Sequence, residues 1–265
     1  MSLHEKSNVY LAISGALLFI LGGVAVLAYV IQNPERFSYS IGTYSTLATE
    51  EESVGTGAAP EGYVLPELTI IETIELPQVS RITGRGINEL LDQRRSRTDF
   101  ADTELALADL SQMLWSAVGE TTEAGYRTTP SRGRAYPVRQ FVVVYRVSEL
   151  EPGLYVYLPE THTLGLLRPG DKSGIWPEIT SQPHPANAAA TIMMVADMTR
   201  GQNFRHTTLQ ESGHMGQNLY LQAESLGLAM TVMGGFSPDA VHAYLDSDPW
   251  EEAVYLVPIG NRVGE

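Results

Sequence analysis

The chain has 265 residues, a mass of 29.0 kDa and a formal net charge of −14 at pH 7. A chain this acidic is a poor candidate for binding nucleic-acid phosphates, so we expect no nucleic-acid partner. Cysteine is absent, which excludes disulfide scaffolds, thiolate metal centres and cysteine nucleophiles. Because hydrophobic residues make up 43% of the sequence, it contains enough apolar material for a folded core.

The first long apolar segment covers residues 9–31 and contains no charged side chain. At about 1.5 Å per residue, a helix of this length measures about 35 Å and can cross a hydrocarbon core of about 30 Å. A cleavable signal peptide is the alternative, but its apolar stretch is usually shorter and no small-residue cleavage site follows. We therefore predict a membrane protein with an N-terminal tail (1–8) and one transmembrane helix (9–31). The nearly balanced flanking charges leave the side of the soluble domain undetermined.

Residues 32–66 are rich in Ser, Thr, Gly, Ala and Glu and show no sustained hydrophobic period. This composition predicts a flexible acidic linker, which would hold the rest of the chain away from an anionic lipid surface. The remaining residues, 67–265, are the right size for one globular domain.

Within this domain the hydrophobic period alternates between that of a helix and that of a strand. Helical spacing and capping residues predict helices at 87–95, 104–119 and 207–226, and a short one from 237. Apolar and β-branched runs predict strands at 140–147, 153–158, 163–167, 190–196, 228–233 and 253–259. The sequence therefore predicts an α+β fold in which helices flank a central, mostly antiparallel sheet.

The common catalytic and metal-binding signatures are missing from the sequence. It contains no P-loop, no dinucleotide-binding glycine motif after a strand, no nucleophile elbow and no zincin motif. Glu211 and His214 have the spacing of half a di-iron site, but no second pair accompanies them, so we expect no metal.

Arginine stands out against the acidic background, because nine of the fifteen arginines lie between Arg81 and Arg139. One cluster, residues 94–97, follows a predicted helix and combines planar bidentate donors with a hydroxyl, a set suited to a phosphate monoester. The other lies in a Gly- and Pro-containing loop, residues 128–137, whose fixed backbone amides would meet the heteroatoms of a planar ligand. The alternative is that these arginines only pair with the acidic surface.

These motifs, taken in order, resemble the nitroreductase family of FMN-dependent oxidoreductases, and more closely its SagB-type dehydrogenase branch. The similarity runs from about residue 65 to residue 262. The segments that carry it include Arg94-Arg95-Ser96-Arg97, Leu114-Trp115-Ser116-Ala117, Thr129-Pro130-Ser131-x-Gly133-x-x-Tyr136-Pro137, Glu211-x-Gly213-His214-x-x-Gln217-Asn218-Leu219 and Gly234-Gly235-Phe236.

The resemblance implies FMN as the cofactor and names the residues that would bind it. The implied set is Arg94, Arg95, Ser96, Pro130, Ser131, Arg132, Gly133, Gly234, Gly235 and Arg262. The first cluster and the C-terminal arginine would hold the phosphate and ribityl chain, and the loop and the two later glycines would lie near the ring. Thr98 stands where the family often has a second basic residue.

The resemblance also implies a homodimer with flavins at the subunit interface, with close helix approach at Gly213 and Gly216. The expected activity is the transfer of electron pairs between a reductant such as NAD(P)H and a small-molecule acceptor by a ping-pong mechanism. Because the flavin would carry the electron chemistry, no side chain is assigned as catalytic. His214 and Tyr136 are candidates, each with the alternative of being a packed side chain.

Two other functions stay open. The branch name suggests oxidation of azoline rings in a modified peptide, but this needs a base, and Lys172 is the single lysine of the domain. A non-catalytic flavin-binding or interaction module is the other alternative. Thr98 and the short segments 171–187 and 198–210 favour that module. Because these segments are expected to border the substrate pocket, the substrate cannot be inferred from relatives.

Overall fold

The computed structural model describes residues 59–82, 84–170, 173–199 and 202–264. In this part of the chain, seven strands form one sheet in the order β1-β4-β3-β2-β5-β7-β6, and every neighbouring pair is antiparallel. The strands are β1 (Glu72–Glu75), β2 (Val138–Val144), β3 (Gly153–Leu158), β4 (Thr163–Pro169), β5 (Ala190–Asp197), β6 (Leu228–Met230) and β7 (Glu251–Asn261). The predicted antiparallel sheet is confirmed.

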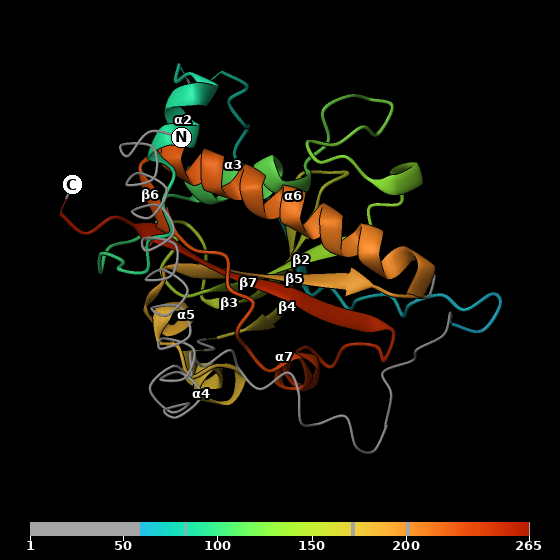
Figure 1. Ribbon diagram of the computed structural model, residues 1–265. Helices are drawn as coiled ribbons and strands as arrows, with labels where there is room; N and C mark the ends of the chain where they lie inside the picture. Colours follow the sequence, from blue (N-terminus) through green and yellow to red (C-terminus); the bar gives the residue numbers. More distant parts are fainter. Residues whose placement is uncertain (1–58, 83, 171–172, 200–201, 265) are drawn as a thin grey trace, which may run out of the picture. The chain divides into compact units, whose positions relative to one another are not determined.

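Helices cover both faces of this sheet, as Figure 1 shows. On one face lie the long helix α6 and, beneath it, α3; on the other lie α4 and α7. The helices are α2 (Ile87–Gln93), α3 (Leu107–Val118), α4 (Trp176–Ile179), α5 (His184–Asn187), α6 (Gln202–Leu226) and α7 (Pro238–Leu245). The predicted α+β architecture is therefore confirmed for the described residues.

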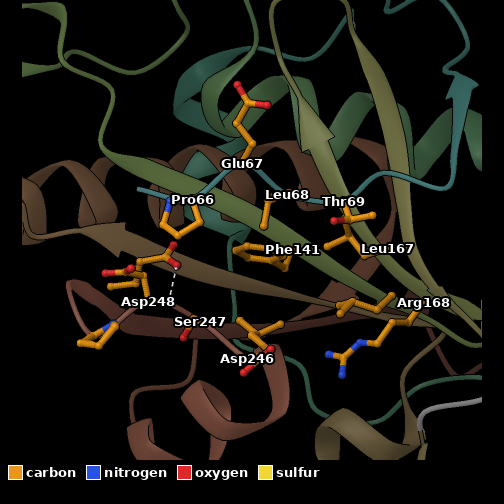
Figure 2. A pocket seen from close by; sticks show the side chains of 14 residues that line it. Pro66, Glu67, Leu68, Thr69, Phe141, Leu167, Arg168, Asp246, Ser247 and Asp248 are labelled. Atoms are coloured by element: carbon orange, nitrogen blue, oxygen red, sulfur yellow. Dashed lines mark hydrogen bonds between the residues drawn. The ribbon is translucent and has the colours of Figure 1, made fainter. Parts of the chain in front are cut away.

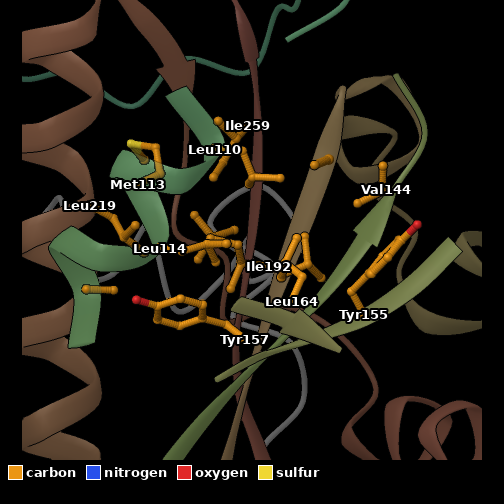
Figure 3. Packing of buried hydrophobic residues seen from close by; sticks show 14 of the residues in the cluster. Leu110, Met113, Leu114, Val144, Tyr155, Tyr157, Leu164, Ile192, Leu219 and Ile259 are labelled. Atoms are coloured by element: carbon orange, nitrogen blue, oxygen red, sulfur yellow. The ribbon is translucent and has the colours of Figure 1, made fainter. Parts of the chain in front are cut away.

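The larger hydrophobic core lies between the sheet and helices α3 and α6 (Figure 3). Leu110, Met113 and Leu114 of α3 are fully buried there, and they meet Leu219 of α6 and Ile192 of β5. Their spacing of three and four places them on one face of α3. Because each buried side chain of this size contributes about 1.5–3 kcal/mol, this contact fixes α6 on the sheet.

A second core fills the opposite face of the sheet, around Trp176 of α4 and Met193 of β5. Strand β2 divides its side chains between the two cores: Val142 belongs to the first, whereas Phe141 and Val143 belong to the second. Successive side chains of a strand point to opposite faces, so a strand covered on both faces is apolar throughout. This is why β2 and β5 are recognisable in the sequence.

Several helices and strands begin or end at other residues than the sequence predicts. Helix α6 begins at Gln202 rather than 207, and the strand predicted at 228–233 ends at Met230. Strand β1 was not predicted, because it is a short edge strand with the mostly exposed sequence Glu-Thr-Ile-Glu and pairs only with β4. An edge strand with one neighbour and little buried surface lacks the apolar run that marks an internal strand.

Residues 59–66, which the sequence places in the linker, contact the domain. The Ala59 amide donates to the Thr199 carbonyl at 2.9 Å, and the Tyr63 hydroxyl donates to the Asp248 carboxylate. The predicted tail, the predicted transmembrane helix at 9–31 and the rest of the linker lie outside the described residues. Among the residues that the structure describes, no helix combines the length and apolar character needed to cross a bilayer.

Candidate functional site

Helix α6 carries polar side chains that reach both arginine-containing segments. In its N-terminal half, Glu211 is hydrogen-bonded to Ser131 of the loop. In its C-terminal half, Tyr220 and Glu224 contact the segment that follows α2. The nine residues from Glu211 to Tyr220 correspond to about 13 Å along the helix axis. One rigid element therefore sets the position of both segments.

Arg94 and Ser96 are held by the side chain of Tyr220. The guanidinium carbon of Arg94 lies 4.9 Å from the centre of the Tyr220 ring, and the Ser96 hydroxyl is 2.8 Å from the Tyr220 hydroxyl. The Tyr220 oxygen also accepts from the Val232 amide at 3.0 Å. Burial by itself raises the pKa of Tyr220, but these hydrogen bonds and the charge of Arg94 lower it overall. The cluster thus joins α2, α6 and the segment leading to Gly234.

Glu224 holds two further arginines beside this cluster. Its carboxylate is 3% exposed and pairs with Arg97 at 2.6 Å and with Arg262 at 3.0 Å. Although burial raises the pKa of Glu224, the two guanidinium groups lower it overall, so the residue is charged. The structure therefore brings Arg262 next to the residues near α2, as the resemblance implies, although one of its nitrogens already bonds Glu224.

Arg95 has a different environment from Arg94. It is exposed, and its Nη1 donates to the carbonyls of Asp92 and Arg94, both at 2.8 Å. These contacts satisfy carbonyls at the C-terminal end of α2, where a cation is favourable. Within the predicted pair, the structure therefore directs Arg95 to its own helix end and Arg94 to Tyr220.

The loop of residues 130–136 is folded against the N-terminal half of α6. Ser131 accepts from the Tyr136 amide at 2.8 Å, and the guanidinium carbon of Arg132 lies 4.3 Å from the centre of the Phe204 ring. Gly133 has φ of +61° within the short turn at residues 132–134, a conformation that glycine adopts without strain. The conformation of this loop is therefore determined by its own turn and by α6.

Asn218 anchors the start of the same loop. Its Nδ2 donates to the Thr129 hydroxyl at 2.9 Å and to the Thr128 carbonyl at 3.3 Å, and the Thr129 hydroxyl donates in turn to the Ala117 carbonyl of α3. Sequence reasoning assigned no role to Asn218, Tyr220 or Glu224. The signal in the sequence that could have found them is the recurrence of polar side chains along the helix that became α6.

Glu211 is a buried carboxyl group at the loop. It is 3% exposed, and its Oε1 has no hydrogen-bond partner in the described part of the chain. Burial raises the pKa of Glu211 to about 7, although the hydrogen bond from Ser131 and the charge of Arg127 act in the opposite direction. Glu211 and Ser131 also line a small cavity together with Thr208. The site therefore includes a carboxyl group able to exchange a proton near neutral pH.

The two catalytic candidates are placed differently from each other. His214 is exposed on α6, so the alternative of a packed core histidine is wrong. Tyr136 is half-buried; its hydroxyl accepts from the Arg127 amide at 3.2 Å, and the Arg127 guanidinium carbon lies 4.4 Å from the ring centre. These contacts pack Tyr136 within the loop, and its role near the flavin stays a prediction.

Gly234 and Gly235 are exposed, four and five residues after the end of β6, a strand that lies beside α6. The Gly235 carbonyl accepts from the Thr180 hydroxyl at 3.0 Å, and a Cβ added to Gly234 would meet no atom within 4 Å. The contacts of Val232 with Tyr220 connect this backbone to the cluster near α2. The backbone is therefore open at Gly234, whereas at Gly235 an added Cβ would lie 3.0 Å from Gln182 Nε2.

Among the other hollows, one of about 550 Å³ lies away from these residues (Figure 2). Phe141 and Leu167 provide apolar lining, and Glu67, Asp246 and Asp248 provide acidic groups. None of the predicted cofactor-binding residues lines it. The predicted residues fall instead into two groups on α6: the cluster near α2 with the two glycines, and the loop at Ser131.

The antiparallel sheet between two helical layers, with an Arg-Ser cluster directly after α2, is an architecture of the nitroreductase class. The model described as the nitroreductase family matches residues 91–261. A curated protein of Methanocaldococcus jannaschii, named as a "putative nitroreductase", is 32% identical over 200 residues, covering 72% of this chain and 96% of that protein. The chain therefore belongs to the nitroreductase family of oxidoreductases.

Solved structures share the fold. A "putative nitroreductase" from Ralstonia eutropha is 25% identical with a TM-score of 0.62, and the match covers 79% of this chain and 99% of that one. Another from Desulfovibrio desulfuricans, solved in complex with FMN, is 17% identical with a TM-score of 0.50, covering 68% of this chain and 87% of that one.

Proposed function

We propose that the protein is an FMN-dependent oxidoreductase and that the cluster near α2 binds the phosphate of the cofactor. The observation that carries the proposal is the fixed pair of Arg94 and Ser96 on Tyr220, in a chain of the nitroreductase family. A cation and a hydroxyl that project from a helix end form a donor set matched to a phosphate monoester. The FMN complex of a structural neighbour supports the same cofactor.

The other residues of the site fit such a cofactor. The charge of Arg262 adds to that of Arg94 beside the phosphate, and Glu224 holds Arg262 and Arg97 in place. The backbone at Gly234 is exposed, and a Cβ added there would meet no atom within 4 Å, which favours close approach of a ligand. When bound, FMN supplies the two-electron chemistry of the proposed ping-pong exchange between NAD(P)H and a small-molecule acceptor.

Glu211 and Ser131 would supply and take up the protons that accompany this electron transfer. The carboxyl group is neutral below about pH 7, and its hydrogen bond with Ser131 connects it to the loop. A group with such a pKa can donate a proton and recover it at physiological pH. We assign Glu211 two roles: it positions the loop through Ser131, and it accepts and releases a proton near neutral pH. Ser131 would lie between Glu211 and the bound ligand.

A homodimer is part of the proposal. Gly213 is exposed on α6 with open space around it, and Ile87 and Leu91 expose 57% and 50% of their surface on α2. A twofold pairing with antiparallel α6 helices would bring the Ser131 loop of one copy opposite Arg94 of its partner. The two groups, about 13 Å apart on one helix, would then complete each other's site.

The finer assignments are proposals on sequence grounds. The order and spacing of the motifs favour the SagB-type branch within the family, and the apolar segment at 9–31 favours a single-pass anchor in a membrane. Together they describe a membrane-anchored flavin oxidoreductase.

The test is to purify the full-length protein in detergent and record its visible spectrum. Flavin absorbance that bleaches when NADH or NADPH is added without oxygen, and returns with an acceptor, is the expected result. Colour without bleaching would reject NAD(P)H as the donor and favour a binding module. A colourless protein that cannot be reconstituted with FMN would overturn the proposal.

A further inference from the structure

Strands β2 and β3 separate at one end of the sheet. Their pairing covers only Phe141–Val144 against Gly153–Val156. Strand β2 nevertheless begins at Val138 and stays paired with β5, whereas β3 runs to Leu158 and stays paired with β4. The sheet is therefore forked there, and each arm remains held by its other neighbour.

A cavity of about 610 Å³ occupies this fork. Its volume is in the range of small-molecule sites. Residues 65–68 and Ile70 line it, together with the arms of the fork and the loop residues Arg134 and Tyr136. Much of the lining is aliphatic or aromatic, including Val118, Val156 and Tyr157, so it can receive an apolar body such as an aromatic ring.

Three arginines line the cavity in an otherwise acidic protein, and one of them, Arg139, is already paired with the buried carboxylate of Glu251. Arg127, Arg134 and Arg139 line it, against the carboxylates of Glu67 and Glu160. Arg127 is held over the Tyr136 ring and pairs through Nη2 with Glu160, whose side chain is 61% exposed. The Nε of Arg127 is buried without a hydrogen-bond partner in the described chain. The N–H group at Arg127 Nε therefore lacks an acceptor, and the carboxylate of a ligand would supply one.

Gln140 supplies an independent indication of a ligand. It lines the cavity and is 1% exposed, and its Nε2 donates to the Leu114 carbonyl at 3.2 Å. Its Oε1 has no partner among the described residues. Because a buried acceptor without a partner costs about 1–3 kcal/mol, this oxygen calls for a donor inside the cavity.

We propose that the fork between β2 and β3 binds a small aromatic carboxylate that carries a hydroxyl group. The carboxylate pairs with Arg127 and Arg134, the ring lies among the apolar side chains, and the hydroxyl donates to Gln140 Oε1. This site is separate from the cluster at Arg94. Its occupant would touch Tyr136, whose amide donates to Ser131 in the loop.

The probe is 4-hydroxybenzoate, titrated into the full-length protein by calorimetry, with the neutral 4-hydroxybenzamide as its isostere. We expect saturable binding of the acid and at least about tenfold weaker binding of the amide, because charge-assisted bonds to arginine are lost. Equal affinities, or no saturation below about 10 mM for 4-hydroxybenzoate and benzoate alike, would overturn the proposal.

Variants that remove a positive or a negative charge from the cavity should change the affinity for 4-hydroxybenzoate in opposite directions. Arg134→Gln should weaken binding of the acid about tenfold, and Glu160→Gln should strengthen it several-fold by removing the competing carboxylate of Arg127. The matched control is Glu123→Gln on the exposed surface outside the cavity, which should leave the affinity unchanged. An equal response of the two glutamate variants would show that only net charge matters and would reject the site.

The role of Gln140 is tested by comparing 4-hydroxybenzoate with benzoate. The hydroxyl should improve the affinity of the native protein and give no advantage in Gln140→Leu, a substitution of similar volume. An unchanged advantage would place the hydroxyl elsewhere and contradict the proposal. Because Arg94→Gln should leave this binding intact, failure of the flavin assignment and failure of the fork site are distinguishable.

Discussion

Glu211 and Glu224 lie on the same helix, and each is 3% exposed. At the C-terminal end of α6, Glu224 bonds two arginines, and its pKa is lowered. At the N-terminal half, Glu211 bonds a serine hydroxyl and leaves one oxygen without a partner, and its pKa is raised to about 7. At equal exposure the two carboxyl groups therefore have pKa values shifted in opposite directions: Glu224 is charged at physiological pH, whereas Glu211 exchanges between its two protonation states.

The difference shows that partners decide whether the effect of burial is overcome: two arginines overcome it at Glu224, whereas Ser131 and Arg127 do not at Glu211. Glu224 is a fixed anion that holds cations in place for a phosphate, which is a structural task. Glu211 is poised between two protonation states, which suits proton exchange.

The largest effect is expected for Glu224→Gln. This change leaves Arg97 and Arg262, which are 29% and 13% exposed, beside a neutral side chain. Each lost hydrogen bond to a charged group costs about 1.5–3 kcal/mol of the free energy of unfolding. Chemical denaturation measures it. The control is Glu89→Gln, which removes the exposed partner of Arg85 and should change stability by about 0.5 kcal/mol or less. Equal losses in both variants would contradict a special role of Glu224.

Glu211→Gln should change the pH dependence of stability. The folded-state pKa of about 7 exceeds the unfolded value of 4.5, so the folded protein binds the extra proton between these values. The contribution of Glu211 to stability therefore falls as pH rises through this window, by about 3 kcal/mol at most. Urea denaturation between about pH 5 and pH 8 should show this slope, and the variant should lack it. A variant with the native slope would assign the titration to another group.

Arg94→Gln should weaken FMN binding about 10- to 100-fold, because a charged hydrogen bond is worth about 1.5–3 kcal/mol. Arg95→Gln is the matched control, since its guanidinium group bonds carbonyls at the end of α2. Fluorescence titration of the apoprotein with FMN compares them. A greater loss for Arg95 would reverse their proposed roles.

Gly213→Ala should give the smallest effect and the sharpest test of the dimer. In an isolated helix this change stabilises by about 1 kcal/mol, because glycine is the poorer helix former. In the proposed dimer the added methyl group would weaken association, which sedimentation velocity detects. Ala243→Gly in α7, on the opposite face of the sheet, should lower stability by a similar amount without changing association. Unaltered association in Gly213→Ala would place the interface elsewhere.

The parts of the fold that sequence reasoning predicted are those with strong local patterns. Helix α3 has a complete apolar face, and β2 and β5 are apolar on both faces because both are covered. Strand β1 was missed, since half-exposed edge residues carry no such pattern. The start of α6 was placed late because its first turns are polar.

The candidate site was predicted only as a set of residue types. Arg94 and Arg95 are adjacent in the sequence and look equivalent, yet one rests on Tyr220 and the other on its own helix end. Asn218 and Tyr220 meet residues 89 and 124 positions away. Such contacts depend on the packing of α6 across the sheet, which no local pattern encodes.

The amino-acid sequence by itself determined the α+β class, the antiparallel sheet and the nitroreductase family, because periodicity and motif order are local properties of the chain. The tertiary structure decided which arginine faces which partner, that Glu211 and Glu224 differ in charge, and that β2 and β3 part to form a cavity. Those features arise from side chains distant in the sequence that share one desolvated environment, where each partner sets the energy of the next.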